Sequence, residues 1–307
     1  MTSSIGNEEL VGTDQTTHYI ALGDARSLAW IPDQSVHLVV TSPPYWTLKK
    51  YNDHPDQLGA IADYTTFLAE LDRVWSHVAR VLVPGGRMAC VVGDVLLSRR
   101  RHQGRHQVVP LHADIAVRCR ALGLDYLTPI IWHKIANASY EVENGSSFLG
   151  KPYEPNAIIK ADLEYILMLR KPGGYRKPTE EQRRRSKLTK EQFNEWFRTF
   201  WTSVPGASTK NHPAPFPIEL AERLVRMFSF VGDTVLDPFL GTGSTMIAAA
   251  NAGRNSIGVE VDPEYRALAA ARLQEYFQQP TLFNGPQPIL KLSQLSEALV
   301  VQSHDAT

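Results

Sequence analysis

The sequence predicts an α/β fold in which helices cover both faces of a largely parallel sheet. Two patterns point to it: apolar runs of strand length alternate with amphipathic helical segments, and several runs are almost continuous in Val, Ile and Leu. Such runs are typical of strands that are buried on both faces. Strands are expected at His18–Asp24, His37–Thr41, Arg87–Gly93, Leu127–Lys134, Asp162–Arg170, Thr234–Asp237 and Ser256–Glu260.

The clearest predicted helix extends from about Tyr64 to Val83. Apolar residues recur there at three- and four-residue steps, from Phe67 to Leu82, as on the buried face of a helix. The tripeptide Pro-Gly-Gly at 84–86 is predicted to end this helix and to turn the chain into the next strand. Further helices are expected at Leu111–Leu122, Lys190–Phe200, Ile218–Phe228, Ser244–Ala252 and Glu264–Phe277.

The composition argues against several classes of protein. With two cysteines, Cys90 and Cys119, in 307 residues, neither a disulfide scaffold nor a cysteine-rich zinc site is expected, and no metal is assigned. The sequence has no apolar run long enough for a membrane span, and its polar N-terminus lacks a signal-peptide pattern, so a cytoplasmic location is expected. Basic and acidic residues balance at 32 each, but a local basic face can exist within a neutral total.

A glycine-containing loop after a short strand is the first candidate site. In the segment Thr234–Thr245 (TVLDPFLGTGST) the strand ends at Asp237 and leads through Gly241 and Gly243 into an alanine-rich helix. Glycines let the backbone turn tightly beside a ligand. Glu260, which ends the next strand, can accept hydrogen bonds from both ribose hydroxyls of a nucleoside-containing cofactor.

This loop favours S-adenosylmethionine over a dinucleotide. The third glycine of the dinucleotide fingerprint is Met246 here, and S-adenosylmethionine has no pyrophosphate to be bound. The alternative is an ordinary strand-to-helix turn. The predicted cofactor-binding residues are Asp237, Pro238, Phe239, Gly241, Thr242, Gly243, Thr245 and Glu260.

A second candidate site, Ser42-Pro43-Pro44-Tyr45, follows a predicted strand. Successive prolines fix the backbone and present its carbonyls as rigid acceptors. The amino group of a base is a poor nucleophile because its lone pair is delocalised into the ring. Protein oxygens that accept hydrogen bonds from its N–H groups localise this lone pair for attack on a sulfonium methyl. The Ser42 hydroxyl and the Pro43 carbonyl are the predicted acceptors, and Tyr45 is predicted to stack on an extruded base. The alternative is a rigid Pro-Pro turn with a packing tyrosine.

Together, TSPPY at Thr41–Tyr45 and DPFLGTGST at Asp237–Thr245 resemble the N4-cytosine/N6-adenine DNA methyltransferase family, with the motif order of its β group. The resemblance covers roughly residues 19–277. It implies a permuted Rossmann-like methyltransferase fold that depends on S-adenosylmethionine, with a seven-stranded, mostly parallel sheet. It also implies that Asp24 contacts the adenine of the cofactor, although a helix N-cap explains this residue equally well, and that Phe216 packs on the methionine end.

The same resemblance divides the chain into parts. These are a flexible N-terminus at 1–16, a catalytic half at 17–134, a target-recognition insert at 135–210 that contributes a sheet strand near 162–170, a cofactor-binding half at 211–279, and a tail at 280–307.

Ser42 favours N4 of cytosine as the target, since SPPY is typical of N4-cytosine enzymes and an acidic residue before PPY is typical of N6-adenine enzymes. N6-adenine methylation is the alternative, and RNA or a protein glutamine are further substrates that PPY loops serve. A degenerate fold that only binds DNA is disfavoured, because Asp237 and Glu260 are present. C5-cytosine methylation needs a cysteine after a proline, whereas Cys90 follows Ala and Cys119 follows Arg.

Double-stranded DNA is the partner that this resemblance implies, in a bacterial or archaeal cytoplasm at the nucleoid. A cognate restriction endonuclease that acts separately is a possible partner, and the enzyme is expected as a monomer or homodimer. Basic clusters can neutralise phosphates, although a solvated surface explains any one of them equally well. The candidates are Lys49, Lys50, Arg99, Arg100, Arg101, Arg183, Arg184 and Arg185.

Overall fold

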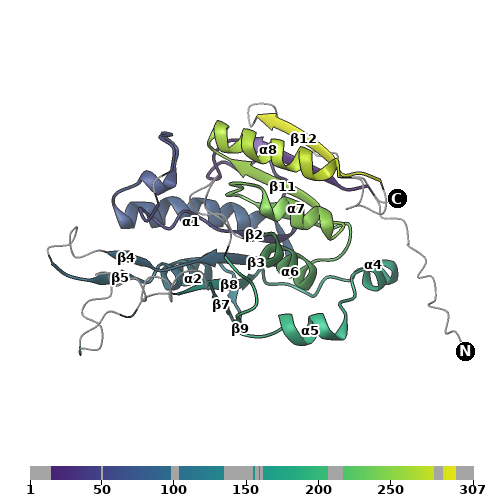
Figure 1. The fold of residues 1–307 in the computed structure, drawn as a ribbon, viewed down its shortest axis with the longest axis horizontal. Helices are drawn as coiled ribbons and strands as arrows, with labels where there is room; N and C mark the ends of the chain where they lie inside the picture. Colours follow the sequence, from purple (N-terminus) through teal and green to yellow (C-terminus); the bar gives the residue numbers. More distant parts are fainter. Residues whose placement is uncertain are drawn as a thin grey trace, which may run out of the picture.

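A mixed sheet of ten strands forms the centre of the protein, for which the computed structural model describes residues 15–49, 51–97, 104–134, 155, 159, 162–206, 217–279 and 286–294 (Figure 1). Its strand order is β12-β1-β11-β10-β2-β3-β8-β7-β9, with β6 paired to β8. The strands are β1 (Thr17–Leu22), β2 (Val36–Thr41), β3 (Leu82–Val92), β6 (Asp125–Tyr126), β7 (Ile130–His133), β8 (Leu163–Arg170), β9 (Phe200–Trp201), β10 (Thr234–Asp237), β11 (Asn255–Glu260) and β12 (Ile289–Gln294).

The predicted α/β methyltransferase fold is confirmed. The seven expected strands form the continuous centre of the sheet, from β1 to β7, and all of them are parallel to their neighbours except β8, which is antiparallel to both β3 and β7. The short strands β9 and β12 extend the two edges. A separate hairpin of β4 (Val95–Leu97) and β5 (Gln107–Val109) follows the carboxyl end of β3.

Helices cover both faces of the sheet because alternate strand residues are apolar on each side. On one face, α1 (Tyr64–Val81) and α2 (Leu111–Ala121) pack on a core that includes Val39, Met88 and Leu236. On the other face the helices are α5 (Lys190–Trp196), α6 (Ile218–Phe228), α7 (Ser244–Asn251) and α8 (Pro263–Phe277). The short helix α4 (Glu180–Arg185) has no buried residue and lies at one end of the sheet (Figure 1). Within the described residues, no helix combines the length and the apolar character that a membrane span requires.

The junction of α1 and β3 differs from the prediction. The helix ends at Val81 and not at Val83, because Leu82 already has extended backbone angles and pairs with Val36 of β2. The Pro-Gly-Gly segment therefore lies inside β3, where the register with β2 shifts, instead of separating helix from strand. Gly85 has a φ of 77°, which a residue with a side chain rarely adopts, so the glycine makes this irregularity possible.

The chain preceding α6 divides between the sheet and two short helices. Both α4 and α5 begin with a capping box, formed by Thr179 with Gln182 and by Thr189 with Gln192. The described part of the segment predicted as an insert thus contributes β8, α4, α5 and β9, while 135–154, 156–158, 160–161 and 207–210 lie outside the described residues. The boundaries of the predicted parts stay predictions.

Candidate active site

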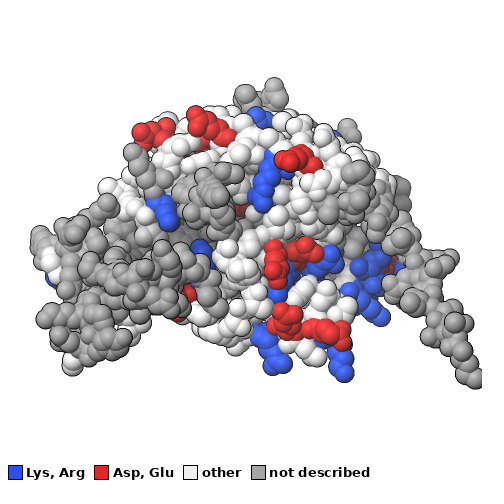
Figure 2. Space-filling view, in the orientation of Figure 1, with Lys and Arg blue, Asp and Glu red and all other residues white. Residues whose placement is uncertain are grey.

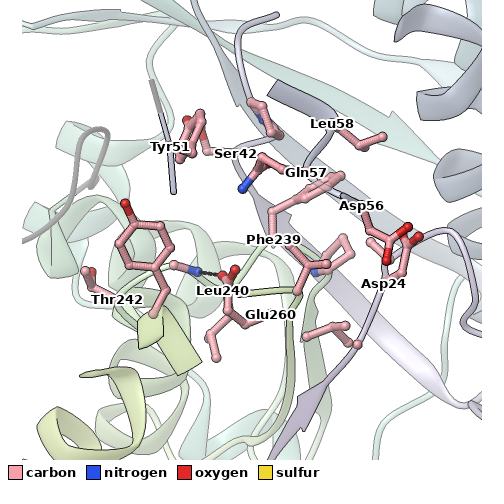
Figure 3. Close-up of a pocket in the computed structure, with 18 of the residues that line it drawn as sticks. Asp24, Ser42, Tyr51, Asp56, Gln57, Leu58, Phe239, Leu240, Thr242 and Glu260 are labelled. Atoms are coloured by element: carbon pink, nitrogen blue, oxygen red, sulfur yellow. Dashed lines mark hydrogen bonds between the residues drawn. The ribbon is translucent and has the colours of Figure 1, made fainter. Parts of the chain in front are cut away.

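A pocket lies at the carboxyl ends of the parallel strands β1, β2, β10 and β11 (Figure 3). Because these strands run in the same direction, the loops that follow them meet at one edge of the sheet. The pocket is lined by Gly23, Asp24, Ala25, Ser42, Pro44, Tyr51, Asp56, Gln57, Leu58, Pro238, Phe239, Leu240, Gly241, Thr242, Ser244, Val259, Glu260, Val261 and Tyr265. The two predicted loops begin at Ser42 and Asp237, 195 residues apart in the sequence. Residues of both loops line this one cavity.

Glu260 presents its carboxylate to this pocket from the end of β11 (Figure 3). One oxygen accepts a hydrogen bond of 2.8 Å from the Gly241 amide and the other accepts one of 3.1 Å from the Asp262 amide. Burial raises the pKa of this carboxyl to about 7, against the opposing effect of those two donors. A carboxylate has more acceptor sites than these two amides occupy, so Glu260 can also accept hydrogen bonds from a ligand's hydroxyls.

Asp237 lies beneath the pocket and is not part of its wall. Its carboxylate accepts hydrogen bonds from the hydroxyls of Thr41 (2.7 Å) and Thr245 (2.8 Å) and from the Phe239 amide (3.1 Å). Only 1% of Asp237 is exposed, and burial raises its pKa to about 6. Asp237 thus holds the loop Asp237–Thr245 in shape, together with the fully buried Thr245 that donates to it.

Gly243 does not line the pocket, and its role is in the packing of the loop against α8. It precedes the first turn of α7 with a φ of 80°, and a Cβ there would lie 2.5 Å from Leu273 Cδ1 of α8. Gly258 of β11 is constrained similarly, because a Cβ would meet Leu240 Cδ1 at 2.6 Å. The predicted wall residues Pro238, Phe239, Gly241 and Thr242 do line the pocket.

Asp24 lines the pocket with its carboxylate fixed by Arg26 at 2.6 Å. Arg26 also pairs with Glu70 at 2.6 Å and with Asp56 at 3.1 Å. Hydrogen bonds from this guanidinium to the Asp24 and Glu70 carboxylates raise its pKa although burial opposes them, so it stays charged. The arginine thus connects the loop after β1 to α1 and to the segment that contains Asp56.

The segment 51–58 forms a wall that the sequence did not reveal. Tyr51, Gln57 and Leu58 line the pocket, and Asn52 donates a hydrogen bond of 3.1 Å to Glu264 at the start of α8. Tyr265 of α8 also lines the pocket. No periodicity marks this segment, and the only available signal in the sequence was an aromatic residue shortly after the motif Ser42–Tyr45.

In the loop Ser42–Tyr45, which is the predicted catalytic loop, Ser42 and Pro44 line the pocket, whereas Pro43 is buried and the half-buried Tyr45 is not among the lining residues. The Tyr45 hydroxyl lies 3.1 Å from Glu164 Oε2 and 3.3 Å from the Val91 carbonyl. Ser42 Oγ lies 3.2 Å from the same hydroxyl. The neighbours of Tyr45 on β3 and β8 come from distant parts of the sequence, and sequence reasoning did not find Glu164.

Comparison with known proteins decides the family. The model of the DNA methylase family that comprises N6- and N4-methyltransferases matches residues 36–271. The chain belongs to this DNA methylase family. It is 38% identical over 283 residues to the type II methyltransferase M.MthZI of Methanothermobacter thermautotrophicus, covering 85% of this chain and 78% of the relative. For M.MjaI of Methanocaldococcus jannaschii the identity is 37% over 290 residues, with 84% and 91% covered.

A solved structure resembles this DNA methylase closely. A protein of Thermus thermophilus, described as a putative DNA modification methylase and crystallised with S-adenosyl-L-methionine, is 55% identical, with a TM-score of 0.73. The likeness covers 91% of this chain and 98% of that protein. The pocket at the carboxyl ends of the strands thus belongs to a methylase whose relative has been crystallised with a methyl donor.

Of the basic residues predicted to bind DNA, the four that the structure describes do not form one group in this methylase. Lys49 is exposed shortly after the loop Ser42–Tyr45, whereas Arg183, Arg184 and Arg185 lie on α4. Ser186, directly after α4, accepts a hydrogen bond from the Val231 amide, which precedes β10. Those arginines therefore lie at the end of the sheet away from the pocket, among acidic and basic side chains that are mixed over α4 and α5 (Figure 2). Lys50, Arg99, Arg100, Arg101 and Phe216 lie outside the described residues.

Proposed function

We propose that the protein transfers a methyl group from S-adenosylmethionine to the exocyclic N4 of cytosine in a specific duplex DNA sequence. The observation that carries this proposal is the shared cavity: Ser42 and Pro44 of the catalytic loop line the same pocket as Phe239 and Glu260 of the cofactor side. Transfer between a bound donor and a bound base requires that the two reactants be held together, which this arrangement provides.

The residues of the pocket fit S-adenosylmethionine as the methyl donor. Glu260 offers acceptor sites to the two ribose hydroxyls, and the Phe239 ring and the Asp24 carboxylate line the adjoining part of the wall for the adenine. The sulfonium of the bound donor supplies an activated methyl group. Asp237, Gly243 and Thr245 support this site indirectly, because they shape the loop from below.

The catalytic loop acts on the base. The Ser42 hydroxyl and the Pro43 carbonyl accept the hydrogens of the target amino group, which localises the nitrogen lone pair toward the methyl group. A nitrogen–carbon bond forms as the carbon–sulfur bond breaks and the sulfonium becomes a neutral thioether, and the cationic amino group then loses one proton to water. The base is extruded from the duplex to reach the pocket, with the half-buried Tyr45 ring as its stacking surface.

Serine at position 42 supports cytosine as the target, and N6 of adenine is the second candidate because both bases carry the same kind of amino group. The relatives M.MthZI and M.MjaI are named type II methyltransferases, which supports a role for this protein as the modification enzyme of a restriction-modification system.

The test is mass spectrometry of nucleosides from DNA incubated with the protein and isotopically labelled S-adenosylmethionine, beside a Tyr45→Ala control. Labelled N4-methylcytosine that disappears in the control is the expected result. Labelled N6-methyladenine would overturn the choice of base and keep the reaction. No labelled base in any DNA, with cofactor binding intact, would overturn DNA as the substrate in favour of RNA or protein.

A further inference from the structure

Glu164 connects three elements directly behind the catalytic loop. It lies on β8 with 14% of its side chain exposed, and its Cγ approaches Gly93 closely. Its Oε2 accepts a hydrogen bond of 3.1 Å from the Tyr45 hydroxyl, and its Oε1 accepts one of 2.8 Å from Lys134 Nζ at the end of β7. A Cβ on Gly93 would lie 3.4 Å from Glu164 Cγ and 3.2 Å from the Tyr45 ring, so the absence of a side chain there allows the contact.

The chemistry of these groups fixes the direction of the hydrogen bonds. Apart from Ser42, the Tyr45 hydroxyl contacts a carboxylate oxygen of Glu164 and the carbonyl oxygen of Val91. Both of these oxygens can only accept a hydrogen bond. The single proton of Tyr45 must therefore go to one of them. The 3.2 Å contact with Ser42 is then a hydrogen bond in which Ser42 donates and the Tyr45 oxygen accepts.

Tyr45 keeps its proton under ordinary conditions. Burial, followed by the nearby negative charge of Glu164, raises the pKa of the Tyr45 hydroxyl well above its usual value. A protonated Tyr45 that donates toward Glu164 always presents a lone pair to Ser42.

We propose that Glu164 is a positioning residue which, through Tyr45, makes Ser42 a hydrogen-bond acceptor toward the target amino group. Ser42 has one proton, and the chain from Ser42 to Tyr45 to Glu164 uses it on the side away from the pocket. Its free lone-pair density then faces the pocket, where the amino group must donate. This inference rests on the proposed role of Ser42, and it applies equally to a cytosine or an adenine amino group.

Lys134 fixes the orientation of Glu164, and this suggests the decisive variant. Lysine is only a donor, so in Glu164→Gln the amide oxygen turns to Lys134 and the amide NH₂ faces Tyr45. The NH₂ donates to the Tyr45 oxygen and competes with the Ser42 hydroxyl for this acceptor, while the shape of the site is unchanged. The Ser42 proton is then free to turn toward the pocket and to oppose the incoming amino group.

The experiment measures single-turnover methyl transfer with the full-length protein, saturating DNA and S-adenosylmethionine. We expect Glu164→Gln to slow this step about tenfold or more, while the Kd values for cofactor and DNA and the melting temperature stay unchanged. A rate equal to that of the wild type would overturn the inference, and so would a loss explained wholly by weaker binding of either ligand.

Two double variants distinguish hydrogen-bond direction from packing. In Glu164→Gln with Lys134→Met, nothing holds the amide oxygen at position 134, so the amide can rotate its oxygen toward Tyr45 and part of the rate returns. In Glu164→Gln with Tyr45→Phe, the rate equals that of Tyr45→Phe alone because the relay is already broken. Losses that add up independently in both double variants would overturn the inference.

Failure of the proposed function gives a different result. If the wild-type protein labels no DNA base, the proposed substrate is wrong, and the same variants are then compared on the substrate that is labelled. If the wild type labels DNA and the variants do not separate as described, the reaction stands and the role of Glu164 is wrong.

Discussion

The Thr41 hydroxyl donates a hydrogen bond of 2.7 Å to Asp237 Oδ1. Thr41 is the last residue of β2, directly before the proposed catalytic loop, and Asp237 is the last residue of β10, directly before the proposed cofactor loop. Both residues are essentially inaccessible to solvent. One buried carboxylate therefore connects the two strands at the point where each leads into a wall of the pocket.

Removal of this link should destabilise the protein. Thr41→Val keeps the shape of the side chain but leaves a buried carboxylate oxygen without its hydroxyl donor, so the free energy of unfolding should fall by about 1–3 kcal/mol. Urea denaturation measures the change. Thr66→Val is the matched control, because its 2.7 Å bond to Asp63 is exposed and its loss costs less. Equal losses in the two variants would contradict the special role of the buried link.

Cofactor affinity should depend on pH through Glu260. Its pKa is raised from 4.5 to about 7, so the carboxyl becomes increasingly protonated below that pH and loses acceptor capacity for ribose hydroxyls. The Kd for S-adenosylmethionine should rise toward about tenfold per pH unit below pH 7, and calorimetry across pH 6–8 measures it. In Glu260→Gln the affinity should be weaker and nearly flat over this range; an unchanged slope would assign the titration to another group.

The same shift predicts an effect on the stability of the cofactor-free protein. Because the folded pKa lies above the unfolded value, the stabilising contribution of Glu260 is complete below about pH 4.5 and is lost as the pH rises through about 7. The cofactor-free protein should therefore melt at a lower temperature at about pH 8 than at about pH 6, and Glu260→Gln should reduce this difference. A difference of the same size in the variant would contradict the assignment.

Gly243 should tolerate no side chain. In Gly243→Ala the new Cβ would have to occupy a site 2.5 Å from Leu273 Cδ1, in addition to the cost of a φ of 80°. We expect a loss of about 2 kcal/mol or more in stability and weaker cofactor binding. Gly123→Ala is the control, since Gly123 has a φ of 88° and no atom within 4 Å of the added Cβ. It measures the backbone cost alone, and an equal loss there would show that the contact with Leu273 is unimportant.

The strands and the two loops could be predicted from the sequence because they depend on local patterns. Apolar runs identify the seven central strands, and parallel strands bring Ser42 and Glu260 to the same edge of the sheet. Direct ligand contact was also predicted for Asp237, Gly243 and Thr245, but the structure places them beneath the wall. A loop motif shows which residues shape a turn, and it does not distinguish contact with a ligand from support of the backbone.

Other parts of the site depend on contacts between distant segments. Glu164 reaches Tyr45 across 119 residues, and the apolar run that follows it in β8 shows only that both faces of this strand are covered. The wall at 51–58 has neither periodicity nor a glycine motif, and it is held in place by single contacts such as that of Asn52 with Glu264. No local pattern could have identified these residues.

The position of the basic residues predicts which of them meet DNA. Lys49 is exposed directly after the catalytic loop, so Lys49→Ala should weaken binding to any duplex and lower the slope of log K against log salt by about one. Arg184→Ala should change neither, because Arg184 lies on α4 at the other end of the sheet and pairs with Glu181 at 2.8 Å. Binding titrations at several salt concentrations compare the two variants. A larger effect of Arg184→Ala than of Lys49→Ala would indicate that DNA binds at the α4 end of the sheet, and it would contradict binding over the pocket.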